Sequence, residues 1–331
     1  MDIPTSLCSL LPNLTLEDYL RCFYLLAAAS ILLASSIAPL STRFFCYGKT
    51  AQPPTNLSAA KKQTKPTSNN SNLTNLLDYL TTLTVPHSYF SHFYLVSLVS
   101  LLFWAAQFLL NGCLLRYLLS LGTRTPSIIE DRISPTQLLL TWLCLLAQSL
   151  RRYHEQLIIS KSPSTSTMLL PHYLLGHAFY LTTTLSLFAS YRNLLPLTTF
   201  PPPPLLKTTL SLPIFLLSSI LQHKTHLYLL SLPKYSLPLK THPLFALSLS
   251  PHYLFEILIY LSLAILSAPP HKFLNKTMLC AVLFVAANLG VSAGRTWEWY
   301  RDRFGEKAVA GKIPSFQGFR VGLRGEMGMG Y

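Results

Sequence analysis

Ionisable and amide side chains gather at three places where long apolar runs of the sequence end. These are residues 151–155 (RRYHE); Gln222, His223, His226, Lys234, His252 and Glu256; and Asn288, Arg295 and residues 297–301 (WEWYR). Charged groups beside or inside apolar segments cost several kcal/mol to desolvate unless they are paired, so they are functional candidates. Arginine and lysine can bind phosphate, while tyrosine and histidine can donate to an oxyanion or carry a proton.

Glu256 is the most informative single residue in these clusters. It follows His252 by four residues, which places both on one helical face, and it enters an otherwise apolar segment. The carboxylate either belongs to a binding site or pairs with His252 or Arg295 to join helices. A buried ion pair is by itself a poor source of stability, which favours the binding site.

Several common kinds of site are excluded by motif. His223 and His226 have the spacing H-x-x-H, but no cysteine or acidic residue stands near them in the sequence, and the six cysteines form no C-x-x-C pair. We therefore predict no metal site. The sequence contains neither G-x-G-x-x-G nor a P-loop, so a bound nucleotide is not held by a Rossmann domain.

The elements that must position these residues are predicted to lie in a membrane. Only 11% of the 331 residues are charged and 50% are hydrophobic, and residues 79–115, 162–191 and 277–294 carry no charge. A soluble domain has about a quarter charged residues, and apolar runs of this length are typical of membrane spans. A soluble enzyme, a nucleic-acid-binding protein and a disordered chain are therefore disfavoured, despite the net charge of +14.

We predict an all-α, multi-pass membrane protein, a bundle of about seven transmembrane helices. The expected spans are residues 19–40, 89–110, 134–150, 168–190, 208–221, 253–266 and 273–293. The fifth is the weakest because it contains Pro213 and follows 201–204 (PPPP), so it could be short, kinked or re-entrant, which would leave six. No segment shows the alternation of a barrel strand.

The regions outside the spans differ in composition. Residues 51–77 are rich in Ser, Thr, Asn, Pro and Lys and are predicted to be a disordered insert, and residues 317–331 a Gly-rich tail. With a lumenal N-terminus, eighteen of the 26 basic residues fall on one side, which predicts that this side and the C-terminus are cytosolic. Asn13 and Asn275 match the N-glycosylation pattern on the lumenal side, although such matches are common by chance.

Seven stretches in the same order resemble a known family. They are residues 43–50 (RFFCYGKT), 85–94 (VPHSYFSHFY), 148–155 (QSLRRYHE), 171–176 (PHYLLG), 222–226 (QHKTH), 242–256 and 288–316. Each alone is weak, but together they resemble the steroid 5α-reductase family, and most closely its polyprenol/polyprenal reductase branch.

The resemblance implies a seven-helix reductase of the endoplasmic reticulum membrane that takes NADPH from the cytosolic side. Its substrate would be a long-chain polyprenal, a membrane lipid, whose α-isoprene double bond is saturated to give dolichal for dolichol synthesis and protein N-glycosylation. Cofactor-binding positions would be Arg152, Gln222, His226, Lys234, His252, Glu256, Asn288, Arg295 and Tyr300. Tyr153 and His154, beside Arg152, are the candidate proton donors.

The sequence also allows other functions. Steroid-reducing relatives carry a glutamate before the second span that has no evident equivalent here, so the residue that contacts the carbonyl is not identified. A steroid or sterol 5α-reductase or an enoyl-CoA reductase of the same family is the alternative enzyme. A transporter or non-catalytic membrane protein fits the composition, but a transporter more often shows an internal repeat and charges at mid-membrane, and neither occurs here.

Overall fold

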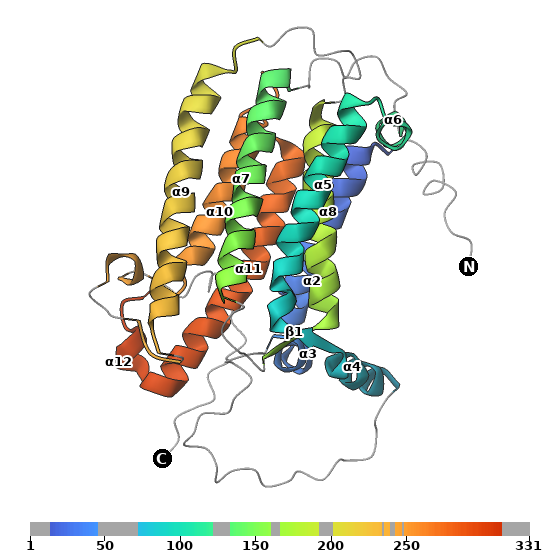
Figure 1. Ribbon diagram of the computed structural model, residues 1–331. Coiled ribbons are helices and arrows are strands. Elements are labelled where there is room, and N and C mark those ends of the chain that lie inside the picture. Colours follow the sequence, from blue (N-terminus) through green and yellow to red (C-terminus); the bar gives the residue numbers. More distant parts are fainter. Residues whose placement is uncertain are drawn as a thin grey trace, which may run out of the picture.

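In the computed structural model, the described part of the chain forms seven long helices that run side by side (Figure 1). The structure describes residues 14–45, 72–121, 133–159, 166–191, 201–233, 235–238, 242–246 and 248–312. The long helices are α2 (Leu16–Ser36), α5 (Phe90–Leu109), α7 (Pro135–Ile159), α8 (Leu170–Tyr191), α9 (Leu205–Ser231), α10 (Pro251–Leu266) and α11 (Lys276–Phe304). Each overlaps one of the predicted apolar runs, so the mostly helical class is confirmed.

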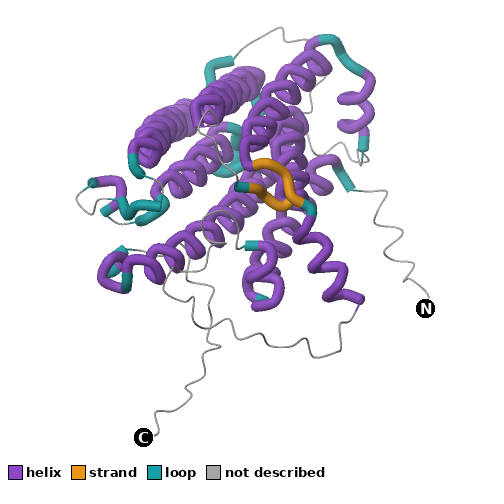
Figure 2. Tube along the Cα trace, turned by 60° about the horizontal axis from the view of Figure 1, so that its bottom comes forward, coloured by secondary structure: helices purple, strands orange, loops and turns teal. Residues whose placement is uncertain are grey.

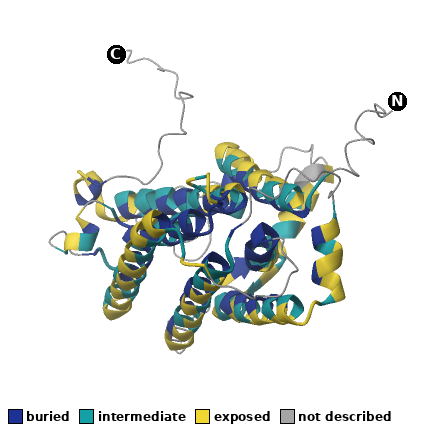
Figure 3. Cartoon of the chain, turned by 90° about the horizontal axis from the view of Figure 1, so that it is seen from above, coloured by how far each residue is buried: buried dark blue, intermediate teal, exposed yellow. Residues whose placement is uncertain are grey.

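Four of the described helical segments are long and apolar enough to cross a membrane, by length and composition. They are Leu16–Ser36, His87–Leu109, Leu205–Ser231 and Lys276–Phe304, and α10 is a shorter apolar helix. Large apolar side chains are exposed along the outside of the bundle, among them Leu102, Leu139 and Leu216. Buried residues turn inward and exposed ones outward (Figure 3), as expected for a helical membrane protein. A crossing by all seven helices stays a prediction.

The polar clusters are helical where the sequence suggested helix ends or a loop. The helix α9 runs without a break through Pro213 and onward to Ser231, so residues 222–226, which were expected in a loop, form part of its last turns. Likewise α7 continues to Ile159, and α11 to Phe304. Hydropathy failed as a guide to these ends because the polar side chains of one helix bond to those of another, which lets the helices extend beyond their apolar stretches.

Two short helices lie off the bundle axis at the end that also holds α12 (Glu306–Val309); we name this the site end. There α2 stops at Ser36, Ile37 is extended, and α3 (Ala38–Phe44) begins with a proline in its first turn. The second short helix is α4 (Asn72–Thr82), and Asp78 on it accepts a hydrogen bond from Arg43 Nε at 2.6 Å. Residues 72–77 are thus helical, not disordered. Residues 51–71 and 317–331 lie outside the described residues.

A two-stranded ladder joins the starts of α5 and α8 at the site end (Figure 2). The strands β1 (Thr84–Pro86) and β2 (Thr167–Leu169) pair antiparallel, and Met168 stands opposite Val85. Three-residue strands give no readable alternation in a sequence, which is why they were not predicted. The ladder fixes where α5 and α8 enter the bundle.

Hydroxyl pairs connect helices inside the bundle. Ser97 on α5 bonds Ser149 on α7 at 2.8 Å, and Tyr24 on α2 bonds Ser186 on α8 at 3.0 Å. Such contacts let membrane helices associate where lipid removes most of the hydrophobic driving force.

At the far end, which holds α6 (Cys113–Ser120), buried side chains bond backbone carbonyls. Asn275 accepts from the backbone N–H groups of Thr277 and Met278 as the N-cap of α11, and its amide donates to Ser190 and to the Ser267 carbonyl. Asn275 is buried, so this structure offers it as a cap rather than as a glycan acceptor. Asn13 lies outside the described residues.

Candidate functional site

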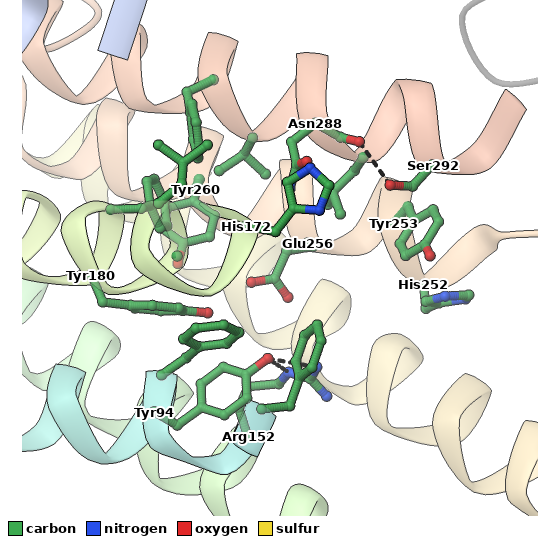
Figure 4. Close-up of a pocket in the computed structure, with 18 of the residues that line it drawn as sticks. Tyr94, Arg152, His172, Tyr180, His252, Tyr253, Glu256, Tyr260, Asn288 and Ser292 are labelled. Atoms are coloured by element: carbon green, nitrogen blue, oxygen red, sulfur yellow. Dashed lines mark hydrogen bonds between the residues drawn. The ribbon is translucent and has the colours of Figure 1, made fainter. Parts of the chain in front are cut away.

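A cavity of about 250 Å³ lies inside the bundle, and Phe45 and Met168 among its lining residues place it near the site end. Its walls come from α5, α7, α8, α9, α10 and α11, together with Phe45 after α3 and Met168 on β2. Polar groups line one part and aromatic rings another (Figure 4). The cavity brings together residues from 45 to 292, which are far apart in the sequence.

The polar part contains six of the residues predicted to bind a cofactor. They are Arg152, Gln222, His226, His252, Glu256 and Asn288. Glu256 accepts hydrogen bonds from the amide groups of Gln222 and of Gln148, the second at 3.3 Å. The carboxylate is therefore held by two amides, and not by His252 or Arg295, whose pairing with Glu256 was the alternative to a binding site. This arrangement fits a binding surface better than an ion pair between helices.

Arg152 connects the polar part to a tyrosine on the opposite wall. The guanidinium donates to the Tyr94 hydroxyl oxygen twice, from Nη2 at 2.8 Å and from Nε at 3.2 Å. Both side chains are buried, and both line the cavity (Figure 4). Because the Tyr94 oxygen accepts two N–H groups, its own proton is left to be donated to another acceptor. Tyr94 was not among the predicted site residues.

Glu155 is a buried carboxylate behind this wall, and only 3% of its side chain is exposed. One of its oxygens accepts from Arg152 and lies 2.8 Å from His226 Nδ1, while the other accepts from Arg151 and lies 2.7 Å from His223 Nδ1. The histidines on α9 thus do have an acidic partner, which is supplied by α7. It was missed because the two helices are about seventy positions apart in the sequence.

The other part of the cavity is an aromatic chamber. Phe179 stacks on Phe284 with ring centroids 5.0 Å apart, and Tyr180 and Tyr260 complete the wall. Gly176 on α8 lets the Phe93 ring pack against its backbone, because a Cβ there would lie 2.7 Å from the nearest ring atom. The chamber offers apolar surface and the hydroxyl groups of these tyrosines, and His172 on α8 lines the cavity as well, with its ring 5.8 Å from that of Phe45.

The structure does not bring every predicted residue to the cavity. Tyr153 and His154 are not among its lining residues, and His154 is exposed, so their predicted role as proton donors has no support from the geometry. Arg295 bonds Glu298 at 2.9 Å and also Ser41, and the Tyr300 hydroxyl donates to the Ser236 carbonyl at 3.3 Å. Both lie on α11 beyond the cavity. Lys234 lies outside the described residues.

Comparison with known proteins gives two kinds of match. The family model for 3-oxo-5-alpha-steroid 4-dehydrogenase matches residues 203–310, which include α9, α10 and α11. The chain is 30% identical to the polyprenal reductase of Saccharomyces cerevisiae over 304 residues, which cover 88% of this chain and 90% of that protein. It is also 33% identical to an uncharacterized protein of Schizosaccharomyces pombe over 174 residues, covering 50% of this chain and 59% of the other.

No solved structure matches the chain. The yeast enzyme aligns along 90% of its length, so this match extends well beyond residues 203–310, which the family model covers. The family inferred from seven short stretches is thereby confirmed, and the chain belongs to the steroid 5α-reductase family, in its polyprenal reductase branch.

Proposed function

We propose that this protein is an NADPH-dependent polyprenal reductase of the endoplasmic reticulum membrane, which converts a long-chain polyprenal to dolichal for dolichol synthesis. The observation that carries the proposal is the composition of the cavity: a buried polar wall from α7, α9 and α10 faces an aromatic chamber. A reductase that joins a charged cofactor to an isoprenoid lipid needs both surfaces within one enclosed space.

The polar wall fits the reactive end of a nicotinamide cofactor. Gln222 and Glu256 present amide and carboxylate groups, which can pair with the donors and the acceptor of a carboxamide. Bound NADPH would supply a hydride to the β-carbon of the conjugated aldehyde. Arg295 and Tyr300, which lie farther along α11, and Lys234 are proposed to bind the phosphate-bearing remainder of the cofactor, as the family resemblance implies.

Tyr94 is the residue that the geometry favours for the carbonyl end of the substrate. Hydride addition to the β-carbon puts negative charge on the carbonyl oxygen, and a hydrogen-bond donor placed there lowers the barrier. The Tyr94 hydroxyl, whose oxygen accepts from Arg152, lines the cavity and can turn its proton toward a carbonyl placed there, beside the Arg152 cation. Transfer of one proton to the α-carbon then completes the saturated aldehyde.

The membrane arrangement is part of the proposal. Seven spans with the site end in the cytosol would put Arg151, Arg152, Lys224 and the basic end of α11 on the cytosolic side, where NADPH is found. The small cavity supports a membrane-embedded substrate. Sites that enclose drug-sized ligands measure roughly 300–1,000 Å³. A cavity of about 250 Å³ would therefore hold only the reacting ends of the cofactor and the polyprenal, while the isoprenoid tail remains in lipid.

The test is a reductase assay with two substrates. Membranes that contain the protein receive NADPH and either a long-chain polyprenal or a 3-oxo-Δ4 steroid, the class named by the matching family model, and mass spectrometry counts the added hydrogens. We expect saturation of the polyprenal, and a loss of about tenfold or more for Tyr94→Phe because an oxyanion contact disappears.

Saturation of the steroid alone would overturn the substrate assignment in favour of the steroid-reducing alternative. Turnover of neither substrate would favour a non-catalytic role.

A further inference from the structure

We infer that Glu155 is a positioning residue, which holds Arg152 in the orientation that leaves the Tyr94 proton available to the substrate. Glu155 itself does not line the cavity, whereas Arg152 and Tyr94 both do. The inference rests on the proposed function, and it adds a role for a residue that touches neither cofactor nor substrate.

The contacts of Arg152 determine its orientation. An arginine guanidinium is a planar fork of N–H groups, so fixing one edge fixes where the other edge points. Glu155 bonds Nη1, and the opposite edge, Nε and Nη2, is the one that donates to Tyr94. Without the carboxylate, Nη1 keeps its contact with His226 Nδ1 at 2.9 Å but loses its charged partner, so the guanidinium plane is held less firmly and can turn about the side-chain torsions.

The position of Glu155 leaves its carboxylate little freedom to move. Glu155 lies three residues after Arg152 on α7, so the two side chains leave the same helical face. Its other oxygen is fixed independently by Arg151 and His223. The carboxylate is thus anchored from both sides and can act as a rigid support for Arg152 rather than follow its movement.

The direction of the Tyr94 proton follows from this arrangement. If Arg152 turns away, the Tyr94 oxygen loses two N–H donors, and its own O–H group can rotate into other hydrogen bonds. The substrate carbonyl then meets a hydroxyl that is neither oriented nor next to an aligned cation. The expected consequence is slower turnover with little change in NADPH affinity.

The competing explanation is that Glu155 acts on the site through His226 and not through Arg152. The Nδ1 atom of His226 also lies beside Glu155, and this histidine belongs to the polar wall that we assign to the cofactor. If the removal of Glu155 acted through His226, it would weaken NADPH binding, and the effect would not depend on Tyr94. The experiment must therefore separate these two routes.

A double-mutant cycle between Glu155 and Tyr94 makes that separation. Glu155→Gln keeps the size of the side chain and an acceptor oxygen, but it replaces the charge-assisted bond to Arg152 by a weaker one. We expect it to lower kcat about tenfold in the wild-type background and less than about twofold in the Tyr94→Phe background. The dissociation constant of NADPH, measured by its fluorescence, should change less than about threefold in both. A residue that merely supports folding would lower kcat equally in the two backgrounds.

Glu17→Gln is the matched control. Glu17 pairs with Arg21 at 3.0 Å near the start of α2, at the far end of the bundle, and it takes no part in the cavity. The control should leave kcat unchanged in both backgrounds. If Glu155→Gln is not recovered folded, Glu155→Asp, which keeps the charge but withdraws it by one methylene, is measured in the same cycle with the same expectation.

Three results overturn the inference: an unchanged kcat, equal losses in both backgrounds, or a loss confined to NADPH affinity. Each of these is read against a wild-type protein that reduces polyprenal. Absence of wild-type turnover is a different result, because it contradicts the proposed function itself.

Discussion

Arg152 is the residue at which the polar wall and the aromatic chamber meet. It contacts Tyr94, Glu155 and His226, which lie on α5, α7 and α9, so this single side chain connects three helices. Such a buried cation needs several partners to offset its desolvation, and it has them. Substitutions around it should therefore separate into effects on catalysis and effects on cofactor binding.

Glu256→Gln is expected to weaken NADPH binding about tenfold while the protein folds normally. Hydrogen bonds to a charged group contribute about 1.5–3 kcal/mol, so a neutral amide in its place loses part of that. Gln148 and Gln222 would still have an amide oxygen to which they can donate. NADPH titration checks this, and an unchanged dissociation constant would remove Glu256 from the cofactor site.

His154→Ala and Tyr153→Phe are expected to keep near-normal turnover, because neither residue lines the cavity. The assay with polyprenal and NADPH compares them with Tyr94→Phe. A large loss in either variant, with a normal result for Tyr94→Phe, would restore the role predicted from sequence and contradict the assignment to Tyr94.

At the scale of elements, the sequence predicted where helices lie better than where they end. The apolar runs marked all seven long helices, because burial and lipid exposure both select apolar residues over some twenty positions. Helix ends depend on contacts that are distant in the sequence. Glu155 with His223 and His226 shows this most clearly: the bonds that keep α7 and α9 helical past their apolar runs cross between two separate segments.

The same distinction applies to the candidate site. Gln222, His226, His252 and Glu256 could be named because they interrupt apolar segments. Tyr94 could not, since a tyrosine in an apolar helix is an ordinary residue until Arg152 is known to face it. Tyr94 does end the stretch 85–94 that resembles the family, but its place in the site depends on its distance from Arg152, which the sequence does not contain.

Asn275→Ala is expected to destabilise the protein by about 2 kcal/mol or more. Loss of an N-cap costs about 1 kcal/mol, and the buried Ser190 hydroxyl and Ser267 carbonyl would each lose a partner as well. Thermal unfolding in detergent measures the change, with Asn75→Ala on the exposed face of α4 as the control. Equal unfolding temperatures for the two variants would contradict the capping role.

At the scale of the whole molecule, the two ends of the bundle differ in chemistry. The site end holds the cavity and the polar clusters, whereas at the far end buried side chains such as Asn275 and Lys207 bond backbone carbonyls. Lys207 donates to the Ala268 carbonyl at 2.9 Å and also to that of Pro269. Under the proposed function, the water-soluble cofactor would therefore enter at the site end, which holds the cavity.

Glu306→Cys and Tyr117→Cys test the proposed orientation. Both positions are exposed, the first in α12 at the site end and the second in α6 at the far end. In sealed endoplasmic reticulum vesicles with the cytosolic face outward, a membrane-impermeant maleimide should label Glu306→Cys above the wild-type background. Tyr117→Cys should be labelled only after permeabilisation. The reverse pattern would show that the topology is the opposite of the proposed one.

The cavity of about 250 Å³ has a consequence for the lipid pool that the protein would serve. A site that encloses only the aldehyde end of an isoprenoid has no means to count the units beyond it. Under the proposed function, the distribution of chain lengths would be set entirely by the prenyl-elongating reaction upstream. Polyprenals of different length should then compete for the site almost equally, and the distribution would pass into the saturated products unchanged.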